Sequence, residues 1–231
     1  MTAQSLAIIL PAYNEASVIG SVLGSLPKKL PWFDQIHTLV IDDGSTDGTH
    51  LVAQAAGAHV VRHRLNRGVG LATITGLAVA RQLGVDAVVM LDSDGQHDPV
   101  DLMAVLAPIR AGSADFVLGT RLKNSGSGMP VIRRLGNRAM NLIVWLSSGI
   151  KTSDSQSGFR AYNRYALERL FLTTSGYEVC TEILLAVRRA GLRQVEVPIR
   201  TIYTAYSRKK GQPVTNAINI LIRLLVKALS G

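Results

Sequence analysis

The first half of the chain repeats one pattern three times: a short apolar run, a polar loop at its end, and a stretch with helical periodicity. Short β-branched runs bounded by turn residues are typical of buried strands. Strands that alternate with helices predict an α/β fold, in which a mostly parallel sheet is covered on both faces. We expect strands at residues 6–10, 38–41 and 88–91, followed by helices at 17–26, 48–56 and 100–109.

The second half continues with less regular spacing. Pro11 should close the first strand, because proline cannot donate a hydrogen bond to a sheet. The sequence indicates further strands at 116–118, 161–162 and 195–199 and further helices at 71–83, 131–148, 179–189 and 214–229.

Two acids follow the third strand at the edge where parallel strands end, which is where open α/β sheets bind ligands. Asp92 and Asp94 are one residue apart, and buried carboxylates are costly unless they meet a cation. We therefore expect a hard divalent cation, Mg²⁺ or Mn²⁺, held by Asp92, Asp94 and the side-chain oxygen of Gln96. An alternative is a polar loop in which Asp98 caps a helix that begins at Pro99, and both can hold together.

Composition narrows the class of protein. The single cysteine, Cys180, excludes an intrachain disulfide, and residues 6–10 are too short for the core of a signal peptide. No apolar run is long enough to span a membrane, so we expect a protein made and kept in the cytosol. The net charge of +9 indicates anionic partners: nucleic acid, an acidic membrane surface or phosphorylated substrates.

Two loops carry candidate contacts to a nucleotide. Asn14 and Glu15 are either acceptors for a base or ribose, or the cap of the next helix. In the loop 42–49, one carboxylate could accept from a base or ribose, while Ser45 or Thr46 could cap the helix that follows.

Gly68 and Gly70 resemble the start of a dinucleotide-binding fingerprint. Thr73 stands where the third glycine belongs, and Gly76 comes too late, so a nicotinamide-binding site is not favoured. Close approach of this turn to a nucleotide remains open, because glycine has no side chain to prevent it.

The later segments are rich in cations. Arg121 follows a strand and suits a phosphate partner. The composition of residues 123–130 predicts a flexible lid or a surface loop. The helix at 131–148 is either a core helix or a membrane-interface helix anchored by Trp145.

Glu178 and Glu182 lie one turn apart on one helix, and both could simply be solvated. The composition of segment 203–211 predicts a mobile basic loop. The amphipathic helix at 214–229 must pack on the domain, on a second subunit or on a bilayer.

Taken in order, these segments resemble a family 2 glycosyltransferase of the dolichol-phosphate mannosyltransferase type. The matching stretches span nearly the whole chain. They are PAYNE at 11–15, DDGSTDGT at 42–49, NRGVG at 66–70, DSDGQHDP at 92–99, GTR at 119–121, SGFR at 157–160 and VPI at 197–199.

The resemblance implies a GT-A fold, which is a Rossmann-like, mostly parallel central sheet covered by helices, here with C-terminal amphipathic helices. It implies one catalytic domain over residues 1–231. Within it, 1–122 would be the nucleotide-sugar-binding half, 123–213 the acceptor-binding half with the basic loop, and 214–231 the amphipathic C-terminal helix.

Site residues carry over by position in the same resemblance. Asp92, Asp94 and Gln96 would be the metal ligands. The catalytic set would be Asp94, Arg121, Arg134 and Arg200, with Arg121 and Arg134 meeting the acceptor phosphate. The donor and its metal would be held by Pro11, Tyr13, Glu15, Ile41, Asp43, Asp92, Ser93, Asp94, Gln96, Arg200, Ser207 and Lys209.

Two positions depart from the family pattern. Ser93 stands where many relatives carry alanine, and the loop 203–211 fits the mannosyltransferase pattern poorly. The second departure leaves the sugar and the base open.

The implied reaction is the inverting, metal-dependent transfer of a hexose, mannose from GDP-mannose or glucose from UDP-glucose, to a polyprenyl or dolichyl phosphate. The enzyme would sit peripherally on the cytosolic face of the membrane, and a second copy or a membrane-protein partner is left open. One alternative is a family 2 transferase with a soluble or glycan acceptor. Another is a basic nucleic-acid-binding protein without catalysis, which the low aromatic content of 5% disfavours.

Overall fold

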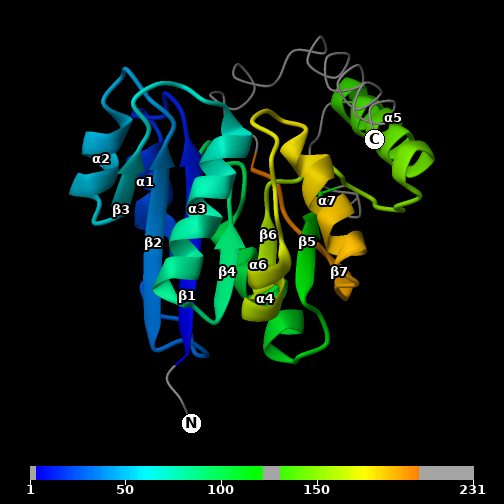
Figure 1. The fold of residues 1–231 in the computed structure, drawn as a ribbon. Coiled ribbons are helices and arrows are strands. Elements are labelled where there is room, and N and C mark those ends of the chain that lie inside the picture. The colour runs from blue at the N-terminus through cyan, green and yellow to red at the C-terminus, as the bar shows by residue number, and fades with distance from the viewer. Residues whose placement is uncertain (1–3, 122–130, 203–231) are drawn as a thin grey trace.

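The computed structural model describes residues 4–121 and 131–202, and a seven-stranded sheet forms its centre (Figure 1). The strand order is β3-β2-β1-β4-β6-β5-β7, and every pairing is parallel except the two that β6 makes with β4 and β5. This arrangement confirms the predicted mostly parallel sheet. The strands are β1 (Ser5–Ala12), β2 (Gln35–Asp42), β3 (His59–Arg62), β4 (Ala87–Met90), β5 (Phe116–Thr120), β6 (Arg160–Asn163) and β7 (Gln194–Pro198).

Helices cover both faces of the sheet. Apolar residues of α3, α6 and α7 pack on one face, toward the viewer in Figure 1, and those of α1, α2 and α4 pack on the other. The helices are α1 (Ile19–Ser25), α2 (Thr49–Ala55), α3 (Val69–Leu83), the 3-10 helix η1 (Pro99–Asp101), α4 (Leu102–Arg110), α5 (Val131–Ser148), α6 (Arg164–Arg169) and α7 (Val179–Arg189).

Strand β1 shows why the sequence folds this way. Successive side chains of a strand point to opposite faces. Ala7 and Ile9 join the core under α3, whereas Leu6, Ile8 and Leu10 join the core under α1 and α4. All five are fully buried, so an uninterrupted apolar run is what a central parallel strand requires.

The predicted end of β1 at Pro11 is wrong, because the strand continues to Ala12. Ala12 accepts a hydrogen bond from the N–H of Asp43 on the β2 side, so the backbone of Pro11 faces the β4 side. The ladder with β4 ends at the pair Ile9–Met90. The missing N–H of Pro11 therefore costs the sheet no hydrogen bond.

Several elements differ from the expectation. The edge strand β3 and the short helix α6 were not expected, and the antiparallel direction of β6 was not either. The four residues of β3 are only partly buried or exposed, so they lack the apolar run that marks the central strands. Helix α1 begins at Ile19, two residues after the predicted start, and β2 begins at Gln35, three residues before it.

The predicted cap of the helix after the acidic loop is confirmed. The side chain of Asp98 accepts a hydrogen bond of 3.0 Å from the N–H of Val100, and Pro99 opens the 3-10 helix η1. Helix α4 continues from Leu102.

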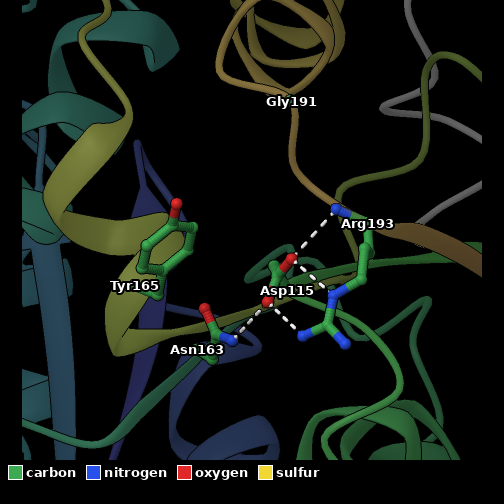
Figure 2. Close-up of a pocket in the computed structure, with 5 residues that line it drawn as sticks. All are labelled: Asp115, Asn163, Tyr165, Gly191 and Arg193. Carbon is green, nitrogen blue, oxygen red and sulfur yellow. Dashed lines mark hydrogen bonds and ion pairs between the residues drawn. The ribbon is translucent and has the colours of Figure 1, made fainter.

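A cavity of about 480 Å³ lies at the edge of the sheet where β5 and β7 begin and β6 ends. Figure 2 shows that Asp115 faces Arg193 and Asn163 there, with Tyr165 beside them. The guanidinium of Arg193 donates to both carboxylate oxygens, at 2.7 and 2.9 Å, and Asn163 donates at 2.9 Å. The hydrogen bonds from Arg193 lower the pKa of Asp115 well below its usual value. These contacts join β5, β6 and β7 at the end of the sheet opposite the acidic loop.

Helix α5 has a mixed environment. Met140 and Val144 are buried, whereas Leu142, Trp145 and Leu146 are exposed. The expectation of a core face is therefore confirmed for one side of the helix only. Among the helices that the structure describes, none combines the length and apolar character needed to cross a membrane.

Candidate active site

The carboxyl ends of the parallel strands and the start of β6 meet at one edge of the sheet, at the top of Figure 1. The loop 42–49 follows β2, the acidic loop that begins at Asp92 follows β4, and Arg121 follows β5. Arg200 follows β7. The fold therefore brings together the segments whose polar side chains the sequence singles out.

The acidic loop presents two carboxylates with different environments. Burial by itself would raise the pKa of Asp92, but the hydrogen bond from His97 and the positive charges of Arg121 and Arg160 lower it. Burial, followed by the negative charge of Asp92, raises the pKa of Asp94 to about 6. The N–H of Gln96 donates to Oδ1 of Asp94 at 3.0 Å.

This donor set fits a hard divalent cation. Burial and the negative charge of Asp92 together raise the pKa of Asp94, and a bound cation would offset both effects. Within residues 4–121 and 131–202, no three His, Cys, Asp and Glu side chains gather into a ready-made metal site. The chain would thus supply two carboxylates and the amide oxygen of Gln96, leaving other positions to ligand oxygens and water, as is common for Mg²⁺.

Ser93, between the two acids, bonds to the protein. Its hydroxyl donates to the carbonyl of Pro11 at 2.8 Å and is buried. The serine that departs from the family pattern therefore ties the acidic loop to the end of β1. Direct contact of either residue with a donor stays a prediction.

The loop 13–15 is fastened to the loop 42–49. The backbone N–H of Asn14 donates to Ser45 Oγ, and the side-chain oxygen of Asn14 accepts from the N–H of Thr46. The N–H of Glu15 donates to Thr49 Oγ1. The predicted caps are wrong: neither α1 nor α2 has a side-chain cap from these residues. These side chains bond between the two loops instead. Tyr13 is 42% exposed beside them, and its contact with a nucleoside stays a prediction.

Asp43 organises the neighbouring loop. Its carboxylate accepts from the N–H groups of Arg67 and Gly68, at 3.0 and 2.8 Å, and lies 2.7 Å from Nδ1 of His63. Ile41, on the same strand end, is fully buried and packs under α3. Its side chain is therefore not available to a nucleoside, and only its backbone could take part.

Gly68 and Gly70 lie against another loop of the protein, and their close approach to a nucleotide stays a prediction. β-Carbons added at these glycines would overlap the backbone oxygens of Thr174 and Ser175. The N–H of Gly70 donates to the carbonyl of Ser175 at 2.7 Å. The glycines are needed because the loop before α7 packs directly on the start of α3.

Arg121 engages a fully buried acid. Its Nε and Nη2 atoms donate to the two carboxylate oxygens of Asp154 at 2.7 and 2.8 Å, and its backbone N–H donates to the same group. This fork fixes Arg121 near Asp92, whose pKa it lowers. A contact with an acceptor phosphate stays a prediction.

Arg200 lies beside the acidic loop. Its N–H donates to Asp101 at 2.6 Å, and 64% of its side chain is exposed. The next residues form an antiparallel bridge, in which Thr201 pairs with His97 and the N–H of Ile202 donates to the carbonyl of Gln96. A role of Arg200 toward the donor stays a prediction.

Some predicted residues lie outside the described part of the chain. The backbone of Arg134 belongs to α5, but its side chain is outside the description. Ser207, Lys209 and the predicted loops and helix at 123–130, 203–211 and 214–229 are outside it as well.

Three residues near Asp92 received no role from the sequence. His97 bonds to Asp92, Gly158 lies against its carboxylate, and Arg160 is a buried cation that lowers its pKa. All three lie in stretches that the resemblance had matched. The contacts of Gly158 and Arg160 with Asp92 depend on β6 lying beside β4, and no local pattern predicts that pairing. His97 reaches Asp92 within the same loop.

A mixed sheet of this order, with an Asp-x-Asp pair at its carboxyl edge, is the arrangement that the resemblance to GT-A glycosyltransferases predicts. A family model described as Glycosyl transferase family 2 matches residues 7–171. The chain belongs to this family, which does not support the alternative of a nucleic-acid-binding protein without catalysis.

The names of two similar proteins agree with this family assignment. The chain is 37% identical over 240 residues to a UDP-N-acetylglucosamine–dolichyl-phosphate N-acetylglucosaminyltransferase from Methanococcus voltae, with 95% of this chain and 94% of that protein covered. It is 32% identical over 205 residues to a polyprenol monophosphomannose synthase from Mycolicibacterium smegmatis, with 83% and 75% covered.

A solved structure shows the same fold. Glucosyl-3-phosphoglycerate synthase from Mycobacterium tuberculosis, in complex with Mn²⁺, UDP-glucose and phosphoglyceric acid, superposes with a TM-score of 0.70 at 26% identity. The match covers 96% of this chain and 79% of that chain.

Proposed function

We propose that this glycosyltransferase moves a sugar from a nucleotide-sugar donor to a polyprenyl or dolichyl phosphate at a membrane surface, with inversion at the anomeric carbon. The observation that carries the proposal is the pair Asp92 and Asp94, placed at the carboxyl edge of the sheet beside Arg200. The names of the two relatives support a lipid-phosphate acceptor.

The residues that would hold the cation are Asp92, Asp94 and Gln96. A divalent cation bound there would act as a Lewis acid that offsets the negative charge of the leaving nucleoside diphosphate. The bound Mn²⁺ in the solved relative supports a metal of this kind. The exposed guanidinium of Arg200 adds positive charge at the same side of the loop.

The acceptor brings its own nucleophile. A phosphate monoester is already an anion near neutral pH, so its oxygen can attack the anomeric carbon without a protein base. The oxygen forms the new bond as the diphosphate leaves with the bonding pair. A single displacement converts an α-linked donor into a β-linked lipid product.

The donor remains one of three candidates. Mannose from GDP-mannose and glucose from UDP-glucose were expected from the sequence, and the name of the Methanococcus relative adds N-acetylglucosamine from UDP-N-acetylglucosamine. We infer that one of these three is the donor.

The test measures release of nucleoside diphosphate from each donor, with Mg²⁺ or Mn²⁺ and detergent-solubilised polyprenyl phosphate. Asp94→Asn should lower turnover by on the order of 100-fold, because it removes charge from the cation site. Asp98→Asn makes the same change in the same loop but keeps an oxygen that can cap η1, so it should retain turnover. Equal turnover by wild type and Asp94→Asn, or an α-linked lipid product, contradicts the mechanism.

A soluble phosphorylated acceptor is a second candidate, since the solved relative was captured with phosphoglyceric acid. Phosphoglyceric acid therefore replaces the lipid in a parallel assay. Product with it, and none with polyprenyl phosphate, would reject the lipid acceptor.

A further inference from the structure

His97 is a buried side chain that contacts one of the two acids. Its Nε2 atom lies 2.9 Å from Oδ2 of Asp92, and only 2% of the side chain is exposed. The Nδ1 atom has no hydrogen-bond partner in the described structure. The contact with Asp92 is therefore the polar interaction that orients the ring, with Nε2 as the donor.

The ring of His97 is held on other sides as well. It meets the ring of Phe159 edge to face, with centroids 5.2 Å apart and planes at 62°. Its backbone pairs with Thr201 in an antiparallel bridge. Contacts from both the β6 side and the segment after β7 thus fix where Nε2 points.

The protein confines the carboxylate of Asp92 on one side, although 47% of its side chain is exposed. Gly158 lies against it so closely that a β-carbon there would overlap the carboxylate. Asp94 is held differently, by the N–H of Gln96. Since the two acids repel each other, each needs its own donor to keep its carboxylate turned toward a shared ligand.

We propose that His97 is a positioning residue, which donates to Asp92 and holds that carboxylate where Asp92 and Asp94 can bind a divalent cation together. The inference rests on the proposed function, because it assumes that these acids form the cation site. His97 itself touches neither the cation nor the substrate in this scheme.

The test compares two variants at the same position. His97→Leu removes the donor, whereas His97→Gln keeps a side-chain N–H at a similar distance from the backbone. The measurement is Mn²⁺ affinity by electron paramagnetic resonance of free Mn²⁺, for the whole chain alone and with UDP or GDP added. Leu106→Ala serves as a control, because Leu106 is fully buried in the core under α4 and its truncation lowers the melting temperature without touching the site.

We expect His97→Leu to weaken Mn²⁺ binding by about 10- to 100-fold, the range typical for hydrogen-bond partners of metal ligands. His97→Gln should recover most of this loss, and Leu106→Ala should bind Mn²⁺ like the wild type. If wild type binds Mn²⁺ and His97→Leu binds it equally well, the inference is wrong and the proposed function stands. If wild type binds no Mn²⁺ under any of these conditions, the proposed cation site is wrong and the inference with it.

Discussion

Gly158 determines how much room the carboxylate of Asp92 has. Its backbone is not in the left-handed region that favours glycine, so the requirement is one of space. Any side chain there would overlap Asp92. Gly158 and the buried cation of Arg160 lie at the start of β6. One short segment therefore both limits the space around the Asp92 carboxylate and lowers its pKa.

Gly158→Ala should therefore displace the Asp92 carboxylate and weaken Mn²⁺-dependent binding of UDP or GDP by at least about tenfold, as expected when a metal ligand is misplaced. Isothermal titration calorimetry measures the effect. Gly24→Ala is the matched control: nothing lies within 4 Å of its added β-carbon, and alanine suits the helix α1. Unchanged affinity in Gly158→Ala would show that Asp92 tolerates the displacement.

Residue types at the site could be predicted, but their bonding partners could not. The acids, Arg121 and the glycines stand at strand ends, where sequence spacing places them. Arg121 nonetheless bonds Asp154, 33 residues away, and Asp43 bonds loop atoms more than 20 residues away. Such pairs depend on how loops pack, which periodicity does not encode.

At the scale of elements, the loop before α7 joins the two layers around the site. Thr173 and Thr174 donate through backbone and hydroxyl groups to Glu182, and the next residues pack on the glycines that begin α3. Partial burial by itself would raise the pKa of Glu182, but the hydrogen bonds from Thr174 and Thr173 lower it to about 2. The expectation that Glu182 is merely solvated is therefore wrong.

Glu182→Gln should lower the free energy of unfolding by about 1 kcal/mol at pH 7, because the charge-assisted hydrogen bonds weaken and the site is partly exposed. Since folding lowers this pKa, the stabilisation is present above the ordinary value of 4.5 and is lost as the pH falls toward 2. The difference between wild type and variant should shrink over that interval.

Urea unfolding at a series of pH values measures this difference. Glu168→Gln is the control, since Glu168 is exposed and its ion pair with Arg169 spans 3.9 Å. A difference for Glu182→Gln that does not depend on pH would contradict the assignment.

Central elements could be predicted and peripheral ones could not. The apolar runs of β1, β2, β4 and β5 are unmistakable because both of their faces are buried. The short edge strand β3 and the six residues of α6 carry weak patterns, and tertiary contacts decide them.

For the molecule as a whole, α5 offers an exposed apolar face. Leu142, Trp145 and Leu146 are 52%, 42% and 71% exposed, and Lys151 lies over the Trp145 ring at 5.6 Å. An aromatic residue beside a cation suits the boundary of an anionic bilayer. The net charge of +9 adds long-range attraction to such a surface.

Replacing Leu142 and Leu146 together by serine should weaken binding to vesicles that contain anionic lipid by about tenfold or more, from the loss of buried apolar area. Co-sedimentation at low and high salt measures the binding. Leu51→Ser, which alters an exposed leucine of α2, should bind like the wild type. Equal binding by all three proteins would assign membrane contact to another surface.

The reversed strand β6 also limits the order in which the sheet can be completed during synthesis. In the described part of the chain, β5 pairs with β6 and β7 alone, and both leave the ribosome after it. A nascent chain that ends near residue 122 would therefore expose β5 on both sides, a state prone to aberrant pairing. The emerging polypeptide remains in that state until residues 160–163 arrive, so the two proposed halves of the enzyme cannot mature one after the other.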